Sequence, residues 1–130
     1  MRRFQSTASV RLATAGGEWV EAWVAESLAA RLIGLAFLPA LLPGCALLLP
    51  GCRSVHTAGM RFPIDVAFMS WPPSREFRVM AVETAVPPWR VVRTPGCADA
   101  VAALEAGAHT LISLGMRPGA RVVVADLSTR

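Results

Sequence analysis

The sequence predicts a single, mainly β domain of the α+β class, shaped as a small barrel or sandwich with one or two short helices. The chain has 130 residues, which suits one compact core. It is 54 % hydrophobic and 17 % charged, a composition that excludes global disorder. Short runs rich in Val, Phe and Leu recur between Gly and Pro turns, as in β proteins. We expect one domain over residues 1–130, with loose termini at 1–8 and 126–130.

The first elements are expected to be a hairpin, a helix and a buried strand. Val10 to Ala15 and Glu18 to Val24 flank a Gly-Gly pair, which is typical of a hairpin turn. Ser27 then caps a predicted helix over residues 28–38, whose leucines recur at spacings of three and four. The uninterrupted apolar run Cys45 to Leu49 predicts a buried strand.

The second half predicts further strands and one uncertain segment. Residues 64–69 alternate with a period of two and predict a strand with one buried face, and residues 77–85 predict the next strand. Short strands are also expected at 89–92 and 121–125, with a short helix between Gly107 and Gly115. Residues 98–107 are rich in alanine, so propensity alone favours a helix there.

The charge pattern argues against nucleic-acid binding as the main role. The formal net charge is +4 and all thirteen basic residues are arginines, scattered along the chain rather than gathered in one block. Nucleic-acid-binding proteins usually concentrate basic residues on one stripe and interleave aromatic residues, and this chain has no tyrosine. We expect no nucleic-acid partner.

Cysteine usage and hydropathy predict a cytoplasmic protein without a transmembrane segment. Cys45, Cys52 and Cys97 are an odd number, and the first residues lack the apolar run of an export signal. Residues 32–52 are uncharged over 21 positions, but three prolines divide them, which argues against a spanning helix. A tight turn at Pro50-Gly51 would hold Cys45 about 10 Å from Cys52, too far for a disulfide, whereas a wider loop would bring the two cysteines closer. We expect no disulfide between them.

A set of motifs extends over about residues 25–124. It consists of Arg31, Gly34-Leu35, Gly44, the run Cys52 to Phe68 with His56-Thr57-x-Gly59-Met60-Arg61-Phe62-Pro63-Ile64-Asp65, then Pro87-Pro88-Trp89, Ala106-Gly107, Gly115 and Pro118-Gly119. With these motifs the chain resembles the domain of unknown function 192 family. The resemblance implies a small, mainly β prokaryotic domain without an established activity. It also implies that residues 101–105 form a strand, and we favour that over the helix. Many members carry Trp and Met at the positions of His56 and Thr57, which argues against a shared catalytic histidine.

The leading functional hypothesis is a ligand- or protein-binding accessory module with its site between Cys52 and Asp65. Arg61 would supply charge, His56 and Thr57 would supply hydrogen bonds, and Trp89 an apolar wall. Trp89 is alternatively a core residue at one end of the barrel. A protein partner would dock through Phe37, Leu41 and Leu42 on the preceding Pro-bounded loop.

The alternative is a small thiol- or metal-dependent enzyme that uses Cys52, His56 and Asp65. A zinc site usually contains a Cys-x-x-Cys or His-x-x-x-His pair, and the sequence has neither, so we expect no metal and no cofactor. Asp65 is instead expected to accept backbone N–H bonds from the turn at His56 to Gly59, with Arg61 as its charged partner. No phosphate loop, GxSxG or HExxH motif is present.

Overall fold

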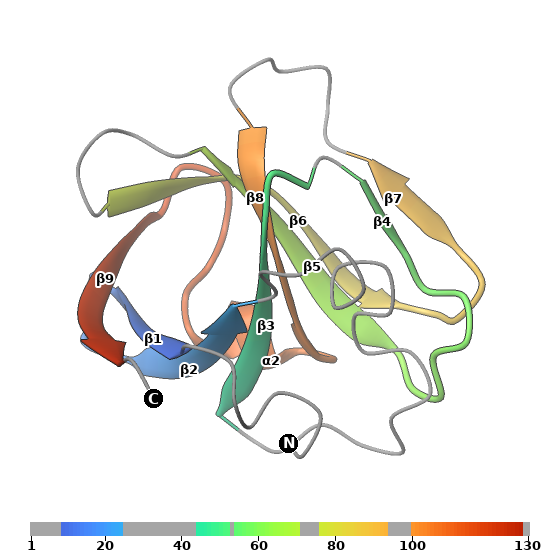
Figure 1. The fold of residues 1–130 in the computed structure, drawn as a ribbon, viewed down its shortest axis with the longest axis horizontal. Helices are drawn as coiled ribbons and strands as arrows, with labels where there is room; N and C mark the ends of the chain where they lie inside the picture. Colours follow the sequence, from blue (N-terminus) through green and yellow to red (C-terminus); the bar gives the residue numbers. More distant parts are fainter. Residues whose placement is uncertain (1–8, 25–43, 53, 71–75, 94–99, 129–130) are drawn as a thin grey trace.

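The mainly β class is confirmed by a closed barrel with a small second sheet beside it (Figure 1). The computed structural model describes residues 9–24, 44–52, 54–70, 76–93 and 100–128. Its elements are β1 (Ser9–Thr14), β2 (Trp19–Val24), β3 (Cys45–Pro50), β4 (Ser54–His56), β5 (Ile64–Ser70), β6 (Glu76–Val86), β7 (Val91–Arg93), β8 (Ala100–Gly107), α2 (Thr110–Ser113) and β9 (Arg121–Ser128). The barrel order is β1-β2-β3-β8-β5-β6-β9, and β4 pairs with β7 outside it.

Most neighbouring strands of the barrel are antiparallel, and the pair β2 and β3 is parallel. The predicted hairpin is confirmed, because β1 and β2 pair around a turn in which Gly17 has a φ of 86°. β3 and β4 do not form a hairpin. The turn at Pro50-Gly51 instead carries the chain from the barrel to the second sheet.

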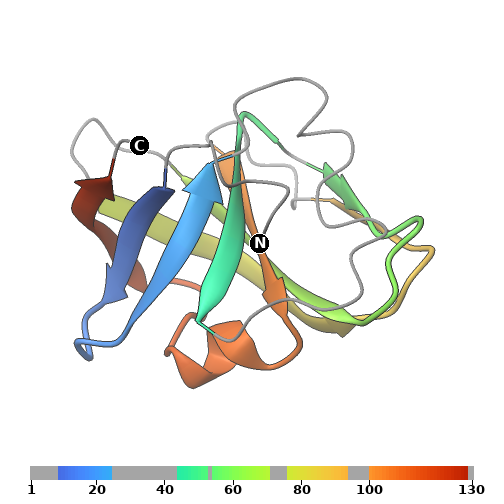
Figure 2. The ribbon, with the colours of Figure 1, turned by 60° about the horizontal axis from the view of Figure 1, so that its bottom comes forward.

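Small side chains fill the inside of the barrel. Five alanines are fully buried there, and they leave room for the larger side chains of Leu12, Phe77 and Met116. α2 lies at one end of the barrel and adds the fully buried side chain of Leu111 to this core (Figure 2). The five alanines are Ala22, Ala46, Ala67, Ala102 and Ala106.

A second core lies between the outer face of the barrel and the β4–β7 sheet. Val55 of β4 and Val92 of β7 pack with Leu47, Ile64 and Phe68 of the barrel strands. The prediction that β5 buries one face is therefore wrong, because its other face, which carries Asp65, is buried as well. A strand covered on both sides carries buried residues at successive positions, so alternation alone does not reveal which residues are exposed.

Residues 100–107 form β8, so the strand predicted for 101–105 is confirmed and the helix favoured by propensity is not formed. β8 pairs with β3 on one side and β5 on the other, and burial between two strands overrides the helix propensity of alanine. β9 continues to Ser128, three residues into the segment expected to be a loose terminus. The predicted helix at 28–38, with Phe37, Leu41 and Leu42, lies outside the described residues, as does Cys97. Among the residues that the structure describes, no helix has the length and hydropathy that a membrane-spanning helix requires.

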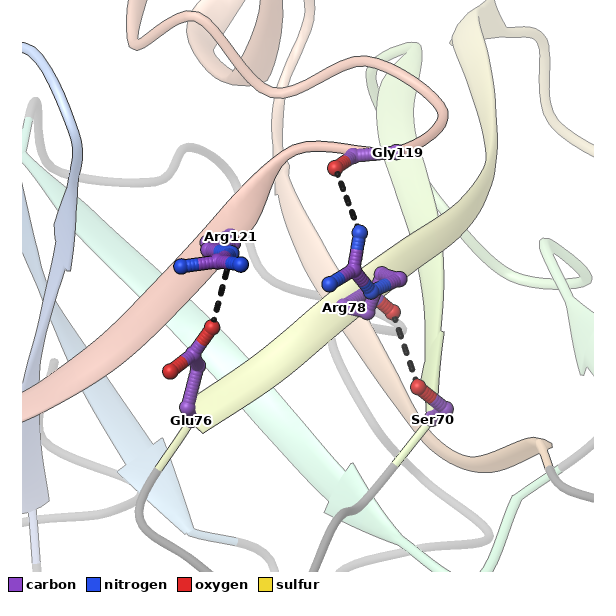
Figure 3. Close-up of polar contacts among 5 residues, drawn as sticks. All are labelled: Ser70, Glu76, Arg78, Gly119 and Arg121. Atoms are coloured by element: carbon purple, nitrogen blue, oxygen red, sulfur yellow. Dashed lines mark hydrogen bonds and ion pairs between the residues drawn. The ribbon is translucent and has the colours of Figure 1, made fainter.

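The barrel closes through a short seam between β6 and β9. Glu76, Phe77 and Arg78 pair in register with Val123, Val122 and Arg121. Figure 3 shows the polar contacts beside this seam: Arg121 Nε lies 3.1 Å from Glu76 Oε1, and Arg78 donates to the carbonyl of Gly119 at 3.4 Å. These side chains are exposed, so the ion pair contributes at most about 1 kcal/mol. Most of β6 extends beyond this seam.

Candidate functional site

Asp65, at one end of the predicted site, binds backbone groups of two other segments of the chain. Its side chain is fully buried at the start of β5. Oδ1 accepts the N–H groups of Ala85 and His109, both at 2.9 Å, and Oδ2 accepts the N–H of Leu111 at 3.0 Å. The expectation that the His56 to Gly59 turn supplies these donors is wrong. The three donors come from the end of β6 and the start of α2, which the fold brings to β5.

Asp65 also stabilises two unusual backbone conformations. Ala85 has a φ of 51° and His109 a φ of 68°, in the left-handed region that residues with a side chain rarely adopt. Thr84 and Ala85 together stand opposite Asp65 in the β5–β6 register, so Ala85 is the extra residue of a β-bulge. A fully buried carboxylate that is bonded to backbone N–H groups offsets the cost of this strain.

Thr57 joins the loop after β4 to the turn before β7. Its hydroxyl donates to the carbonyl of Pro87 at 2.7 Å and accepts the N–H of Arg90 at 2.7 Å. Its backbone carbonyl accepts the N–H of Trp89 at 3.1 Å, and its own N–H donates to the carbonyl of Arg90 at 2.9 Å. Since Thr57 is fully buried and bonded on every side, it positions the Trp89 turn rather than offering its hydroxyl to a ligand.

Trp89 is exposed and its backbone is strained. Its relative exposure is 71 %, so the alternative that it fills one end of the barrel is wrong. Its φ is 66°, an outlier for a bulky residue. Strained residues persist where the surrounding structure fixes them and they cluster at functional sites. Here the fixing contacts come from Thr57.

His56, Arg61 and Trp89 all belong to the exposed surface around the β4–β7 sheet. His56 of β4 stands directly opposite Val91 of β7, and both side chains are exposed, Val91 by 63 %. Arg61 is exposed on the loop whose turn is closed by the bond from Met60 N–H to the Thr57 carbonyl. Arg61 is therefore on the surface while Asp65 is fully buried, so the expected pairing of the two is wrong.

Cys52, His56 and Asp65 differ sharply in their surroundings. Cys52 is half-buried and packs against the second core, whereas His56 is exposed. The Asp65 carboxylate bonds to backbone groups of other segments. Among the described residues, no group of three or more Cys, His, Asp or Glu side chains has a metal-binding arrangement. Cys45 on β3 forms no disulfide.

Sequence reasoning missed Glu105 of β8. Its side chain is 3 % exposed, and burial raises its pKa from 4.5 to about 8. Among the residues that the structure describes, neither Oε1 of Glu105 nor the buried Nε1 of Trp23 has a hydrogen-bond partner. The register places Trp23 and Glu105 on either side of Leu47. The signal was present in the sequence, because Glu105 is the only charged residue between Ala100 and Gly107.

Comparisons with known proteins agree with this architecture. A family model, DUF192, described as "Uncharacterized ACR", matches residues 10–124. No curated protein matches the chain. A "putative transcription regulator" of Sinorhizobium meliloti is similar in structure, with a TM-score of 0.70, 22 % identity, and coverage of 89 % of this chain and 92 % of that chain. A protein of unknown function from Novosphingobium aromaticivorans is similar with the same TM-score and identity, and this match covers 88 % of this chain and 82 % of that chain. At this identity the two structures establish the fold alone.

Proposed function

The chain belongs to the DUF192 family, and from this premise and the exposed β4–β7 surface we propose that it acts as a binding or accessory module rather than as an enzyme. The single observation that carries the proposal is Trp89, which is 71 % exposed in a strained backbone conformation and held there by Thr57. A large aromatic side chain gains little stability from such a position, because it buries little apolar surface. Contact with a ligand explains why it is held outward.

The chemistry around Trp89 favours a ligand that is both apolar and anionic. Trp89 and Val91 are exposed apolar residues, and Arg90, which lies between them in the sequence, is exposed as well, as is Arg61 on the loop after β4. Guanidinium groups bind carboxylates and phosphates through paired hydrogen bonds. We therefore favour a small aromatic carboxylate, or an acidic side chain of a protein partner, as the occupant.

We further propose that the protein is located in the cytoplasm and that nucleic acid is not its main partner. An unpaired Cys45 thiol is typical of a reducing compartment. The Sinorhizobium meliloti protein is called a "putative transcription regulator", and a DNA duplex is therefore one of the comparison probes in the test below. The partner surface at Phe37, Leu41 and Leu42 stays a prediction from the sequence.

The enzyme alternative is less well supported by the site. An imidazole that activates a thiol usually needs a third group to orient it, and the Asp65 carboxylate is bonded to three backbone N–H groups instead. Iodoacetamide labelling tests this alternative. We expect Cys52 to react across pH as an ordinary cysteine peptide does, and rapid labelling at neutral pH that depends on His56 would overturn the proposal.

Fluorine NMR of protein labelled with 5-fluorotryptophan tests the proposed site. The probes are a panel of small aromatic carboxylates, with the matching amides and a DNA duplex as comparisons. We expect the carboxylates to shift the Trp89 signal, which the Trp89→Phe spectrum assigns, and to leave the Trp19 signal unchanged. Trp19 is the matched control, since it is 50 % exposed and stacks on Arg11 at 4.1 Å.

Arg61→Ala and Arg90→Ala should weaken the carboxylate response at Trp89 without unfolding the domain. Equal shifts at Trp19 and Trp89 would mean non-specific binding. A response to DNA that exceeds the response to every carboxylate would replace this proposal with nucleic-acid binding.

A further inference from the structure

The edge of β6 that faces away from β5 is paired over only part of its length. β9 pairs with Glu76, Phe77 and Arg78, and Val79 then exchanges backbone hydrogen bonds with Gly119 and Ala120. From Met80 to Val86, β6 has a strand partner only on its β5 side within the described part of the chain. Long unpaired strand edges are templates for another strand.

Along this edge, the backbone groups of Val82 and Thr84 point away from β5 and have no strand partner among the described residues. The N–H of Val79 points to β9, because it donates to Ala120. Successive residues of a strand point their backbone groups to opposite sides. Met80 is an extra residue in the register and shifts this alternation by one position, so the backbone groups of Val82 and Thr84 point to the same side as those of Val79. Ala85 agrees with this alternation, because its N–H points to the opposite side and donates to Asp65 of β5.

An apolar groove runs along this edge. It has a volume of about 380 Å³ and lies between Val82 and Thr84 on one side and Ile112, Met116 and Pro118 on the other. Ile112 is 56 % exposed, although it is a large aliphatic residue. The groove therefore combines an apolar wall with a strand edge that no other strand covers within the described ranges.

A second groove continues from Thr84 toward β7 and carries positive charge. Its volume is about 410 Å³, and Arg90 and Arg93 line it together with Thr84 and Val86. Arg117 lies at the first groove, so three arginines flank the β6 edge. Glu83 is the acidic residue among the lining residues of the two grooves.

We propose that the β6 edge at Val82 and Thr84 is a docking site for an extended, acidic peptide segment of a partner protein, which adds to the sheet as a strand. Backbone hydrogen bonds to Val82 and Thr84 would provide affinity for any extended chain. An apolar side chain over Ile112 and Met116, and carboxylates near Arg117, Arg90 and Arg93, would provide specificity. The centre of this site differs from the Trp89 surface, because Val82 and Thr84 belong to the β6 edge, and Arg90 is the residue that both proposed sites use.

Amide hydrogen exchange of the free protein tests the premise. We expect the amides of Val82 and Thr84 to exchange fast, while those of Ala81 and Glu83, which face β5, exchange slowly. Slow exchange at Val82 and Thr84 in a dilute monomer would mean that this chain covers its own edge, and would overturn the proposal.

A library of random dodecapeptides displayed on phage tests the occupant. Peptides selected on the intact protein should alternate apolar with acidic residues, and the synthetic peptides should slow exchange at Val82 and Thr84. Ile112→Asp should weaken their binding about tenfold or more, because it removes an apolar contact and adds a like charge. The matched control is Val123→Asp, another exposed aliphatic position, on β9, which should bind as the wild type does.

Two further variants test whether the peptide binds to the β6 edge and not to the Trp89 surface. Thr84→Pro removes one edge N–H and should reduce peptide binding, and Ile112→Asp keeps the test valid if the proline variant does not fold. Trp89→Ala should leave peptide binding unchanged, because Trp89 lines neither groove, and it should abolish the carboxylate response, so this variant distinguishes the two proposals. Selected peptides that are basic, or whose binding ignores Ile112→Asp, would overturn the proposal. Concentration-dependent dimers that Ile112→Asp abolishes would make a second copy of this chain the occupant instead.

Discussion

The N–H of Ala85 donates to the Asp65 carboxylate at 2.9 Å, and Ala85 holds a φ of 51° at that bond. A buried side chain of β5 thus fixes a bulge at the end of β6. The same carboxylate accepts the N–H of His109, a second residue with a positive φ, and so fixes the entry into α2. Asp65 connects three segments that are distant in the sequence.

Asp65→Asn should therefore destabilise the fold strongly. The amide offers one acceptor oxygen in place of two and directs an NH₂ group toward a backbone donor, so buried N–H groups lose their partner. We expect a loss of about 3 kcal/mol in the free energy of unfolding, measured by urea denaturation. Glu83→Gln is the control, since it changes an exposed carboxylate next to the same bulge and should alter stability by less than about 0.5 kcal/mol. Equal stability of Asp65→Asn and the wild type would contradict this role.

Thr57→Val should loosen the Trp89 turn. The substitution keeps the shape of the side chain but removes the hydroxyl that bonds to Pro87 and Arg90. We expect a loss of about 1 to 2 kcal/mol in the free energy of unfolding. We also expect a narrower fluorine signal from Trp89, because its side chain becomes more mobile. Thr57→Ser retains the hydroxyl and should preserve both the stability of the wild type and its Trp89 fluorine signal. If the serine variant behaves like the valine variant, the methyl group rather than the hydrogen bonds holds the turn.

Two substitutions of Trp89 separate backbone strain from side-chain function. Trp89→Gly relieves the left-handed conformation, whereas Trp89→Ala retains it. We expect the glycine variant to be more stable than the alanine variant by about 1 kcal/mol in thermal or urea unfolding. Both should lose the response to aromatic carboxylates. A glycine variant no more stable than the alanine variant would argue that the positive φ carries no strain.

Glu105 should make the stability of the domain fall as the pH rises. Burial raises its folded pKa from 4.5 to about 8, so the folded state holds this proton more tightly than the unfolded chain. The stabilisation from this proton is complete below pH 4.5 and is lost as the pH rises toward 8, with a slope of at most about 1.4 kcal/mol per pH unit.

Glu105→Leu isolates this contribution from that of the other carboxylates. The difference in unfolding free energy between the variant and the wild type should grow with pH between 5 and 8 in favour of the variant. Leucine is of similar size and leaves no buried oxygen without a partner. A difference that does not change with pH would show that Glu105 titrates normally.

Much of the fold was predictable from local patterns. The Gly-Gly hairpin, the apolar run that became β3 and the alternation of β5 and β6 are local features, and each appears at the predicted place. β8 needed the family resemblance, because its alanines favour a helix when taken alone. Its neighbours β3 and β5 supply the burial that makes it a strand.

Hydrophobic period and turn residues act over a few positions, so the sequence alone was enough to predict the mainly β class and the places of β1, β2, β3, β5 and β6. Tertiary structure decided what each polar residue does. It directed Asp65 and Thr57 inward to backbone partners 20 to 46 positions away and turned Trp89 outward. It also left Val82 and Thr84 on an edge of β6 without a strand partner in the described part of the chain. These outcomes depend on which distant segments meet at a buried carboxylate or a strand edge, and local periodicity carries no information about such contacts.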